Sequence, residues 1–406
     1  MKLRAKRRVS HKWTALLLLG AVLAQAEIRV QCPGDTDGDA VVDQPVSGRQ
    51  IKCMHLSAGD GFANMADGKL QYIFSFANLT GTPVADAMMA GMLAAEFPAP
   101  LITLKEGEEF YLTVTNVGMT RRPDLFDGHS VHFHGFPNAS AVFDGVPDAS
   151  AVPVMAASFT YYYNIVEPGT YMYHCHVEAT EHMQMGMLGN LYVQPKQNDL
   201  ADGTVLGTHV HRNPDGAGPL GDRYVYNDGD GSTRYDVEFP IQMSSFDPAF
   251  HEASLEVQPL PFAMMRDKYA MLNGRGYPDT INPSPLPNSE TGGFGQKMNS
   301  RVSAVRGQKI LLRLSNLSVT AFFTLTSSGL PMKVVGTGAR LLRGPDGKDL
   351  YYETNSITLG GGEAADVIVD TSSLQPGTYF LYTSNLNFLS NDGEDFGGMM
   401  TEVVIQ

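Results

Sequence analysis

Two pairs of similar stretches lie far apart in the chain and occur in the same order. Residues 106–116 (EGEEFYLTVTN) resemble residues 306–316 (RGQKILLRLSN), and Glu167-Pro-Gly-Thr-Tyr resembles Gln375-Pro-Gly-Thr-Tyr. Self-similarity of this kind is the signature of a repeated structural unit. The length of 406 residues allows two domains of ordinary size. We therefore predict two copies of one fold, joined by the Gly- and Asp-rich segment 198–234.

Each predicted copy consists of short strand-forming runs separated by turns. Gly (42) and Pro (24) are frequent, and only residues 85–95, rich in Ala and Met, favour a short helix. The strand-like runs are 101–104, 109–114, 159–165, 190–193, 235–241, 310–314, 365–369 and 378–382. This pattern predicts an all-β protein of tandem β-sandwiches. We expect an N-terminal extension at 27–65, a first domain at 66–197, a linker at 198–234 and a second domain at 235–406.

The first 26 residues read as a secretory signal peptide. A basic head precedes the apolar stretch 14–23, and Ala24-Gln25-Ala26 offers a cleavage site. The apolar stretch is too short for a membrane span, and no later stretch is long enough. We therefore expect a periplasmic or secreted protein. Its net charge of −14, which cleavage would make more negative, argues against nucleic acid or an anionic membrane as a partner.

The chain has three cysteines, and in an oxidising compartment we expect two of them to pair and one to stay a free thiol. Cys32 and Cys53 lie close together in a turn-rich segment and could form a disulfide. Cys175 is then left without a partner. Its neighbours in the sequence supply a reason for an unpaired thiol.

Six histidines fall in two short windows at the ends of predicted strands. The first window is His129-Ser-Val-His-Phe-His-Gly, and the second runs from His174-Cys-His to Met187. Side chains alternate along a strand, so Cys175 points to one face while His174 and His176 point to the other. Two metal sites on opposite sides of one strand follow from this alternation.

A thiolate, two imidazoles and a weak thioether are the ligands of a type 1 (blue) copper site. His182 and Met187 can fold back toward the sulfur of Cys175, and His129 supplies the second imidazole. The remaining histidines, which share the opposite face, are His132, His134, His174 and His176. Electrons would pass between the sites through Cys175 and the adjacent His174 and His176. Zinc also accepts Cys and His, but it explains neither Met187 nor the two faces.

These motifs resemble those of the multicopper oxidase family, which includes two-domain laccase-like enzymes and is related to the copper nitrite reductases. The resemblance covers residues 66–196 and, more weakly, 235–406. It implies tandem cupredoxin-like Greek-key β-sandwich domains and a type 1 copper, with a type 2/type 3 centre as the second site. By position it assigns the type 1 ligands to His129, Cys175, His182 and Met187, and the second-centre ligands to His132, His134, His174 and His176. Asp144-Gly-Val-Pro also resembles a turn of this family.

Two features depart from the family pattern. Six residues separate Cys175 from His182, two more than in the usual laccase loop. In the second half, the positions matching the two windows begin at Thr320 and Tyr382 and carry no ligand. A full cluster in this family uses eight histidines, so four must come from elsewhere.

Three completions of the second centre are open. Two first domains could face each other, which makes the protein a homo-oligomer and, by resemblance to two-domain relatives, a trimer. A single type 2 copper could lie at a subunit boundary as in nitrite reductases, although His132 stands where those enzymes have an aspartate. His209-Val-His211 in the linker could also donate.

The reading that combines these features is a copper oxidoreductase. It would take single electrons from a phenolic compound, a metal ion or a redox protein, and reduce dioxygen to water. Asp127 and Glu178 are candidate proton carriers. The alternatives are a nitrite reductase-like enzyme and a non-catalytic blue-copper electron carrier or copper-binding protein.

Overall fold

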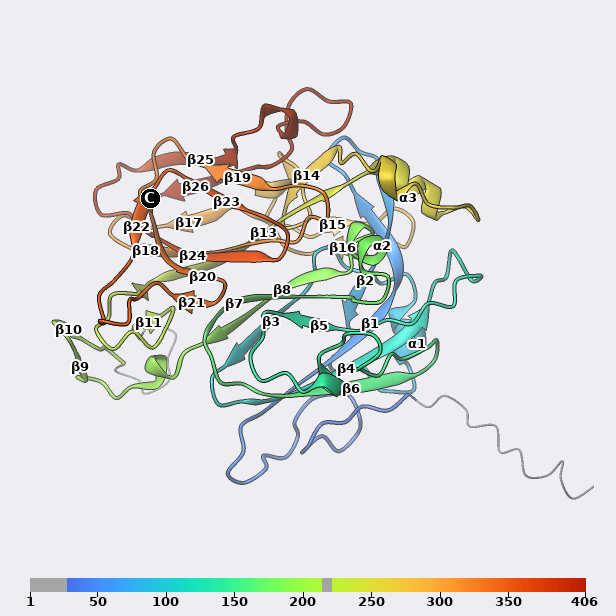
Figure 1. Ribbon diagram of the computed structural model, residues 1–406, viewed down its shortest axis with the longest axis horizontal. Helices are drawn as coiled ribbons and strands as arrows, with labels where there is room; N and C mark the ends of the chain where they lie inside the picture. The colour runs from blue at the N-terminus through green and yellow to red at the C-terminus, as the bar shows by residue number, and fades with distance from the viewer. Residues whose placement is uncertain (1–27, 214–220) are drawn as a thin grey trace, which may run out of the picture.

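The computed structural model describes residues 28–213 and 221–406, and strands dominate it (Figure 1). The expected signal peptide at 1–26 lies outside these residues. The strands form two β-sandwiches, as predicted from the turn-separated runs. Among the described residues, no helix combines the length and apolar character needed to cross a membrane.

The first sandwich consists of two four-stranded sheets, ordered β2-β1-β4-β6 and β3-β8-β7-β5. The strands of the first sheet are β1 (Ile51–Asn64), β2 (Leu70–Asn78), β4 (Glu109–Gly118) and β6 (Ser158–Asn164). Those of the second are β3 (Ala99–Lys105), β5 (His132–His134), β7 (Gly169–His174) and β8 (Leu188–Gln194). Apolar side chains from both sheets meet in one buried core.

The second sandwich pairs a seven-stranded sheet with a five-stranded one. The larger sheet contains β13 (Val237–Phe246), β14 (Tyr269–Leu272), β18 (Lys309–Asn316), β20 (Met332–Thr337), β21 (Arg340–Leu341), β22 (Tyr352–Thr354) and β24 (Glu363–Asp370). The smaller contains β17 (Val302–Ala304), β19 (Phe323–Thr326), β23 (Ser356–Leu359), β25 (Gly377–Thr383) and β26 (Met400–Ile405). A separate apolar core fills the space between them.

The two sandwiches repeat one topology. The order β2-β1-β4-β6 recurs as β14-β13-β18-β24, and β3-β8-β7-β5 recurs as β17-β26-β25-β19. Each copy has the same two parallel pairs, β1 with β4 and β3 with β8 in the first, β13 with β18 and β17 with β26 in the second. Tyr171 donates a hydrogen bond to the Glu167 carbonyl (3.1 Å), and Tyr379 donates one to the Gln375 carbonyl (2.9 Å). The predicted internal repeat is confirmed at the level of individual contacts.

The expected N-terminal extension at 27–65 is wrong in its second half. Residues 51–64 form β1, which pairs with β2 on one side and β4 on the other. This strand is buried on both faces from Cys53 to Ala63, and its buried side chains include the polar ones of His55, Ser57 and Asp60. Cys32 and Cys53 form a disulfide, which ties the preceding segment to this strand.

Helices are short and lie between strands. The helix expected at 85–95 is reduced to α1 (Ala87–Gly91), and the sequence did not indicate α2 (Ala179–Gln184) or α3 (Pro248–Ser254). At the start of α3 the carboxylate of Asp247 accepts hydrogen bonds from the next turn. The short 3₁₀ turns are η1 (Ala141–Phe143), η2 (Lys196–Asp199), η3 (Phe262–Met264), η4 (Asp279–Ile281) and η5 (Leu386–Phe388).

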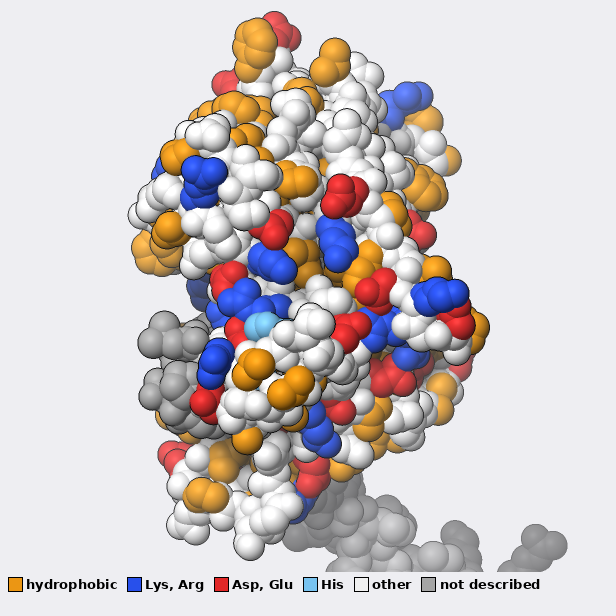
Figure 2. Space-filling view, turned by 90° about the vertical axis from the view of Figure 1, so that its left-hand side faces the viewer, with side chains coloured by type: hydrophobic (Ala, Val, Ile, Leu, Met, Phe, Trp, Pro, Cys, Tyr) orange, Lys and Arg blue, Asp and Glu red, His pale blue; other side chains and the backbone are white. Residues whose placement is uncertain are grey.

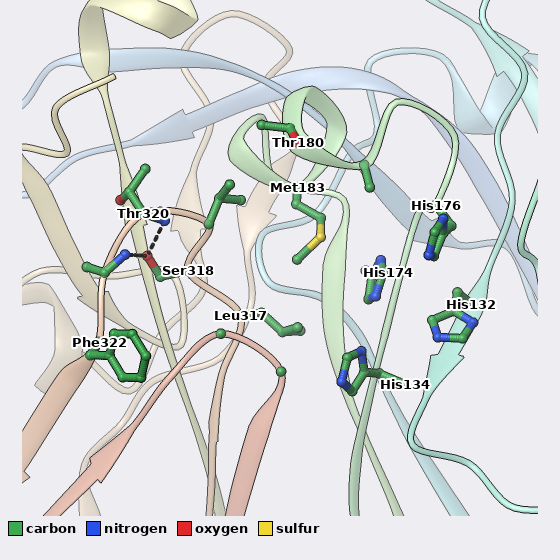
Figure 3. A pocket seen from close by; sticks show the side chains of 15 residues that line it. His132, His134, His174, His176, Thr180, Met183, Leu317, Ser318, Thr320 and Phe322 are labelled. Atoms are coloured by element: carbon green, nitrogen blue, oxygen red, sulfur yellow. Dashed lines mark hydrogen bonds between the residues drawn. The ribbon is translucent and has the colours of Figure 1, made fainter. Parts of the chain in front are cut away.

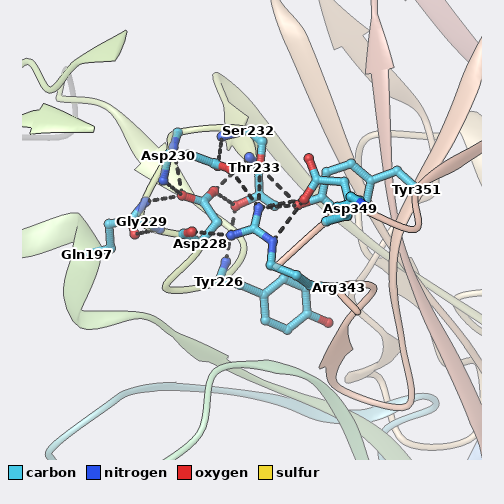
Figure 4. A network of polar contacts seen from close by, with 12 residues as sticks. Gln197, Tyr226, Asp228, Gly229, Asp230, Ser232, Thr233, Arg343, Asp349 and Tyr351 are labelled. Carbon is cyan, nitrogen blue, oxygen red and sulfur yellow. Dashed lines mark hydrogen bonds and ion pairs between the residues drawn. The ribbon is translucent and has the colours of Figure 1, made fainter. Parts of the chain in front are cut away.

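The linker packs against the second sandwich through a polar network (Figure 4). The guanidinium of Arg343 contacts Asp230 at 2.8 Å and Asp349 at 2.6 Å. Asp228 accepts backbone hydrogen bonds from its own turn, including that of Thr233 at 2.8 Å. The linker strands are β9 (Val205–Leu206), β10 (His209–Val210), β11 (Arg223–Tyr224) and β12 (Arg234–Tyr235), and the remaining hairpin is β15 (Leu286–Pro287) with β16 (Phe294–Gln296).

A buried ionic network joins the two sandwiches. Arg313 is fully buried and contacts Glu238 at 2.6 Å, Asp366 at 3.3 Å and the Thr170 hydroxyl of the first sandwich at 3.1 Å. An apolar cluster drawn from both sandwiches lies in the same junction. On the face in Figure 2, Lys and Arg side chains are interspersed with Asp and Glu side chains.

Candidate metal centres

The first group of candidate ligands lies in the core of the first sandwich. Sγ of Cys175 lies 3.3 Å from Nδ1 of His182 and 3.9 Å from Nδ1 of His129. All three side chains are fully buried. Cys175 follows β7, His182 lies on α2, and His129 precedes β5. Three segments thus bring one thiol and two imidazoles together.

Met187 belongs to the same cluster. Its side chain is fully buried in the core that also contains Cys175. Its carbonyl accepts a hydrogen bond from the Cys175 amide (3.1 Å), and its amide donates to the His182 carbonyl (2.8 Å). The two additional residues between Cys175 and His182 are accommodated by α2, which begins after Glu178 in a left-handed conformation (φ 45°). The longer loop therefore leaves all four predicted type 1 ligands together.

Burial sets the protonation of this group. It lowers the pKa of His182 to about 4 and that of His129 well below its usual value, so both imidazoles are neutral near pH 7. It raises the pKa of the Cys175 thiol to about 11, which makes the anion costly without a cation beside it. Nε2 of His129 and of His182 are buried without hydrogen-bond partners. A soft cation would be held by Sγ of Cys175, the two Nδ1 atoms beside it and the Met187 thioether, and this donor set fits copper.

The second group lies on the opposite side of the same strand. In the antiparallel pairing of β5 with β7, His132 lies opposite His174, and His134 lies opposite Met172. The ring of His132 is 5.2 Å from that of His174 and 5.1 Å from that of His176, and the His134 and His174 rings are 5.7 Å apart. One nitrogen from each of His132, His134 and His174 lies within 4.8 Å of the others. The structure thus places the candidate ligands in two groups, one on each side of the strand.

Backbone carbonyls fix two of these rings. Nδ1 of His132 lies 2.7 Å from the Asp144 carbonyl and 3.4 Å from the Asp144 carboxylate. Nδ1 of His174 lies 2.8 Å from the Cys175 carbonyl. With Nδ1 engaged, each of these rings keeps Nε2 as the nitrogen available to a metal. Asp144 follows η1 in the Asp-Gly-Val-Pro turn, where Gly145 (φ 73°) packs so tightly that a Cβ would meet the Val131 carbonyl.

The four histidines form one wall of an open pocket of about 500 Å³ (Figure 3). Thr180 and Met183 of α2 line it as well, and the facing wall comes from residues 317–322 and 361–362 of the second sandwich. Gly362 packs against His134, since a Cβ there would lie 2.7 Å from Nε2. Burial lowers the pKa of His174 to about 3 and also lowers that of His134. The imidazoles of His134 and His174 are therefore neutral near pH 7, and the facing wall carries no histidine.

The second sandwich has other residues at the positions equivalent to these ligands. Superposing the Gly-Thr-Tyr repeats aligns Cys175 with Thr383, and the pairing of Thr326 with Tyr382 repeats that of His132 with His174. At these positions the register places no histidine or cysteine. Its loops shape the pocket without contributing an imidazole.

The linker histidines lie outside both groups. Nε2 of His209 is 2.8 Å from Asp222, and Nδ1 of the buried His211 is 2.9 Å from the Tyr224 hydroxyl. Neither histidine lines the pocket beside the four histidines. The hypothesis that this pair donates to the second centre of its own chain is therefore wrong.

One of the two candidate proton carriers lies at the other site. A carboxylate oxygen of Asp127 is 4.0 Å from Nε2 of His182, in the first group, and the charge of Glu178 acts on Asp127. Neither lines the pocket, so their expected place beside the second centre is corrected. The acid beside that centre is Asp144, whose sequence signal was the Asp-Gly-Val-Pro turn.

The fold and the buried thiol–imidazole–thioether group are those of a cupredoxin copper protein. Models of multicopper oxidase domains match residues 80–198 and 251–406. The chain belongs to the multicopper oxidase family, and copper is its cofactor.

Parts of the chain are similar to curated laccases, and a solved structure shares its fold. Laccase abr2 of Aspergillus fumigatus is 31% identical over 121 residues, or 29% of this chain and 19% of the relative. Laccase-3 of Thanatephorus cucumeris is 24% identical over 298 residues, or 72% of this chain and 43% of the relative. The chain thus spans less than half of these relatives. The blue copper oxidase of Nitrosomonas europaea shares the fold, with a TM-score of 0.61 and 19% identity over 88% of this chain and 86% of that one.

Proposed function

We propose that the protein is a copper oxidase that takes up single electrons at one site and reduces dioxygen to water at another. The type 1 site would consist of His129, Cys175, His182 and Met187, and the second centre would be held by His132, His134, His174 and His176. The observation that carries the proposal is the strand end at Cys175, which faces one ligand group while its neighbours face the other. Copper bound at the two groups would supply one-electron transfer and dioxygen binding.

The residues of the chain have distinct roles in this proposal. The neutral histidines can bind a cation without first losing a proton, whereas the Cys175 thiol must release one. Cys175 is covalently joined to His174 and His176, which gives electrons a route of a few bonds. Asp144, which contacts His132, would deliver protons to the second centre.

The second centre is completed, in this proposal, by another copy of the chain. Four histidines form only one side of the open pocket, and the facing loops of the same chain carry none. Phe322, which lines this pocket, is exposed over 76% of its surface and would be covered by a neighbouring chain. We propose a homotrimer in which first domains of adjacent chains share the centre.

We also propose that the protein acts in the periplasm or outside the cell. The predicted signal peptide and the Cys32–Cys53 disulfide support this location, since disulfides persist in oxidising compartments. The electron donor would be a phenolic compound, a metal ion or a redox protein reaching the His182 side of the first site.

The experiment combines three measurements on copper-loaded protein. These are the copper content per chain, the electron paramagnetic resonance spectrum, and oxygen uptake with phenolic, metal-ion and artificial donors. We expect a blue protein with more than one copper per chain, oxygen uptake, and a solution mass above that of one chain. One copper per chain without oxygen uptake would identify a carrier, and nitric oxide from nitrite without oxygen uptake would identify a nitrite reductase. Either result overturns the proposal.

A further inference from the structure

Tyr72 and Asp60 form a hydrogen-bonded pair inside the first sandwich. The Tyr72 hydroxyl donates to Oδ2 of Asp60 at 2.9 Å. Tyr72 is 2% exposed and Asp60 is completely buried. The two residues lie on β2 and β1, which pair so that Asp60 faces Phe74 and Phe62 faces Tyr72. A buried phenol thus has a carboxylate directly in line with its proton.

The Asp60 carboxylate has capacity to take up a proton. Oδ2 also accepts a hydrogen bond from the Arg121 amide (2.7 Å), while Oδ1 is buried without a partner. Two other buried tyrosines donate to carboxylates that are paired with a cation. The acceptors of Tyr226 and Tyr235 are Asp366 and Glu238, and both pair with Arg313. Within the part of the chain that the structure describes, no such ion pair reaches Asp60.

Aromatic contacts connect this pair to the first metal group. The Tyr72 ring centroid lies 5.4 Å from that of Phe74, and the Phe74 centroid lies 5.9 Å from that of His182. His182 in turn lies against the sulfur of Cys175 at 3.3 Å. A single phenylalanine ring therefore separates Tyr72 from a proposed copper ligand.

We infer that Tyr72 is a redox-active tyrosine with Asp60 as its proton acceptor. The inference rests on the proposed function, because oxidised copper on the His182 side is the oxidant. Tyr72 gives one electron to that cupric ion, which becomes cuprous. The phenol O–H bond breaks, the proton moves to the Asp60 carboxylate, and a neutral tyrosyl radical remains. One electron from an external donor and the returning proton restore the phenol.

The environment of Tyr72 favours transfer of its electron and its proton together. Burial and the nearby charge of Asp60 raise the pKa of Tyr72 well above its usual value, so the phenol does not ionise first. An oxidised phenol is a strong acid, and Asp60 accepts its proton without any rearrangement. The pair would hold one electron in reserve for times when no donor is bound.

Tyr161 provides the matched contrast. It is buried near Cys175, and its hydroxyl accepts a hydrogen bond from the Val131 amide at 2.9 Å. No carboxylate among the described residues receives its proton. Tyr161 therefore lies near the same thiol but lacks the acceptor that Tyr72 has.

The test uses the copper-loaded full chain, reduced and then mixed with dioxygen without a donor. We expect a tyrosyl radical in the paramagnetic resonance spectrum, with hyperfine structure that changes when ring-deuterated tyrosine is incorporated. The radical should be lost in Tyr72→Phe and Asp60→Asn and kept in Tyr161→Phe. Circular dichroism establishes that each variant is folded. If Asp60→Asn does not fold, the comparison of the two Tyr→Phe variants decides the question.

The outcomes separate this inference from the proposed function. If the wild type consumes oxygen but shows no radical, or shows the same radical in Tyr72→Phe, the inference is overturned and the oxidase proposal stands. If the wild type consumes no oxygen, the oxidase proposal fails. The metal-free chain is then oxidised with a photogenerated ruthenium(III) complex, where a radical dependent on both Tyr72 and Asp60 supports the pair and an unchanged radical in both variants overturns it.

Discussion

His132 and His174 lie directly opposite each other on β5 and β7, with ring centroids 5.2 Å apart. Residues opposite each other in an antiparallel pair share one face of the sheet. Cys175 follows His174 and therefore faces the other way, into the core. Substitutions on the two faces should accordingly affect the two metal groups separately.

Cys175→Ser should remove the intense blue absorption while copper at the four histidines is retained. The thiolate is the ligand that gives a type 1 site its character, and a serine hydroxyl does not replace it. Visible spectra and copper content check the result. Thr383→Ser, at the equivalent position of the second sandwich, should leave both unchanged. A variant that stays blue would refute the assignment of Cys175.

Gly362→Ala should impair the second centre and spare the first. The added Cβ would lie 2.7 Å from Nε2 of His134, and the residue has φ +89°. Left-handed backbone alone costs about 1–2 kcal/mol without a glycine. Gly347→Ala is the control, because its φ is +78° and nothing lies within 4 Å. Copper content and the electron paramagnetic resonance spectrum check the result. Loss of second-centre copper in both variants would show that backbone strain, rather than contact with His134, is responsible.

Arg313→Met should destabilise the protein by about 3–5 kcal/mol, since it leaves Glu238 and Asp366 buried without a cation. Denaturant unfolding measures the change. Arg340→Met removes an exposed ion pair with Glu167 and should cost less than about 1 kcal/mol. Equal effects in the two variants would contradict the structural role of the buried network.

The metal-free protein should lose stability as the pH falls from about 6.5 toward 4. Burial lowers the pKa of His55 to about 4, as it does for His182, so the folded state keeps these rings neutral. Unfolded imidazoles take up protons below 6.5, and the free energy of unfolding then falls by up to about 1.4 kcal/mol per pH unit for each such group. Unfolding midpoints across this range test the sign. A His55→Gln variant should show a shallower slope.

Cys32→Ser combined with Cys53→Ser should lower the free energy of unfolding by about 3 kcal/mol, because the disulfide closes a loop with a sequence separation of 21. The measurement is denaturant unfolding at neutral pH. Adding a reductant to the wild type should reproduce the loss, and adding it to the double variant should change nothing.

The sequence predicted those parts of the fold and site that depend on residues close together in the chain. Alternation along β7 fixed the opposite directions of His174 and Cys175, and the repeated Gly-Thr-Tyr turns indicated two copies of one sandwich. The position of β1 could not be predicted in this way, because its burial depends on pairing with β2 and β4 far along the chain. Residues 317–322 form one wall of the pocket because the two sandwiches pack together. This packing cannot be predicted from any single stretch of sequence.

Helix α2 escaped prediction for a different reason. Six residues are too few to show helical periodicity. The contact of Asp144 with His132 depends on a turn that folds back over twelve residues of chain. Both features become visible only when the strands around them are in place.

The hydrogen bond from Tyr379 to the Gln375 carbonyl is equivalent to the one from Tyr171 to the Glu167 carbonyl, although no metal ligand follows Tyr379 at the equivalent positions. The second sandwich therefore keeps the fold without metal ligands, whereas the first carries the candidate copper ligands. We therefore expect removal of copper to leave the stability of the second sandwich unchanged.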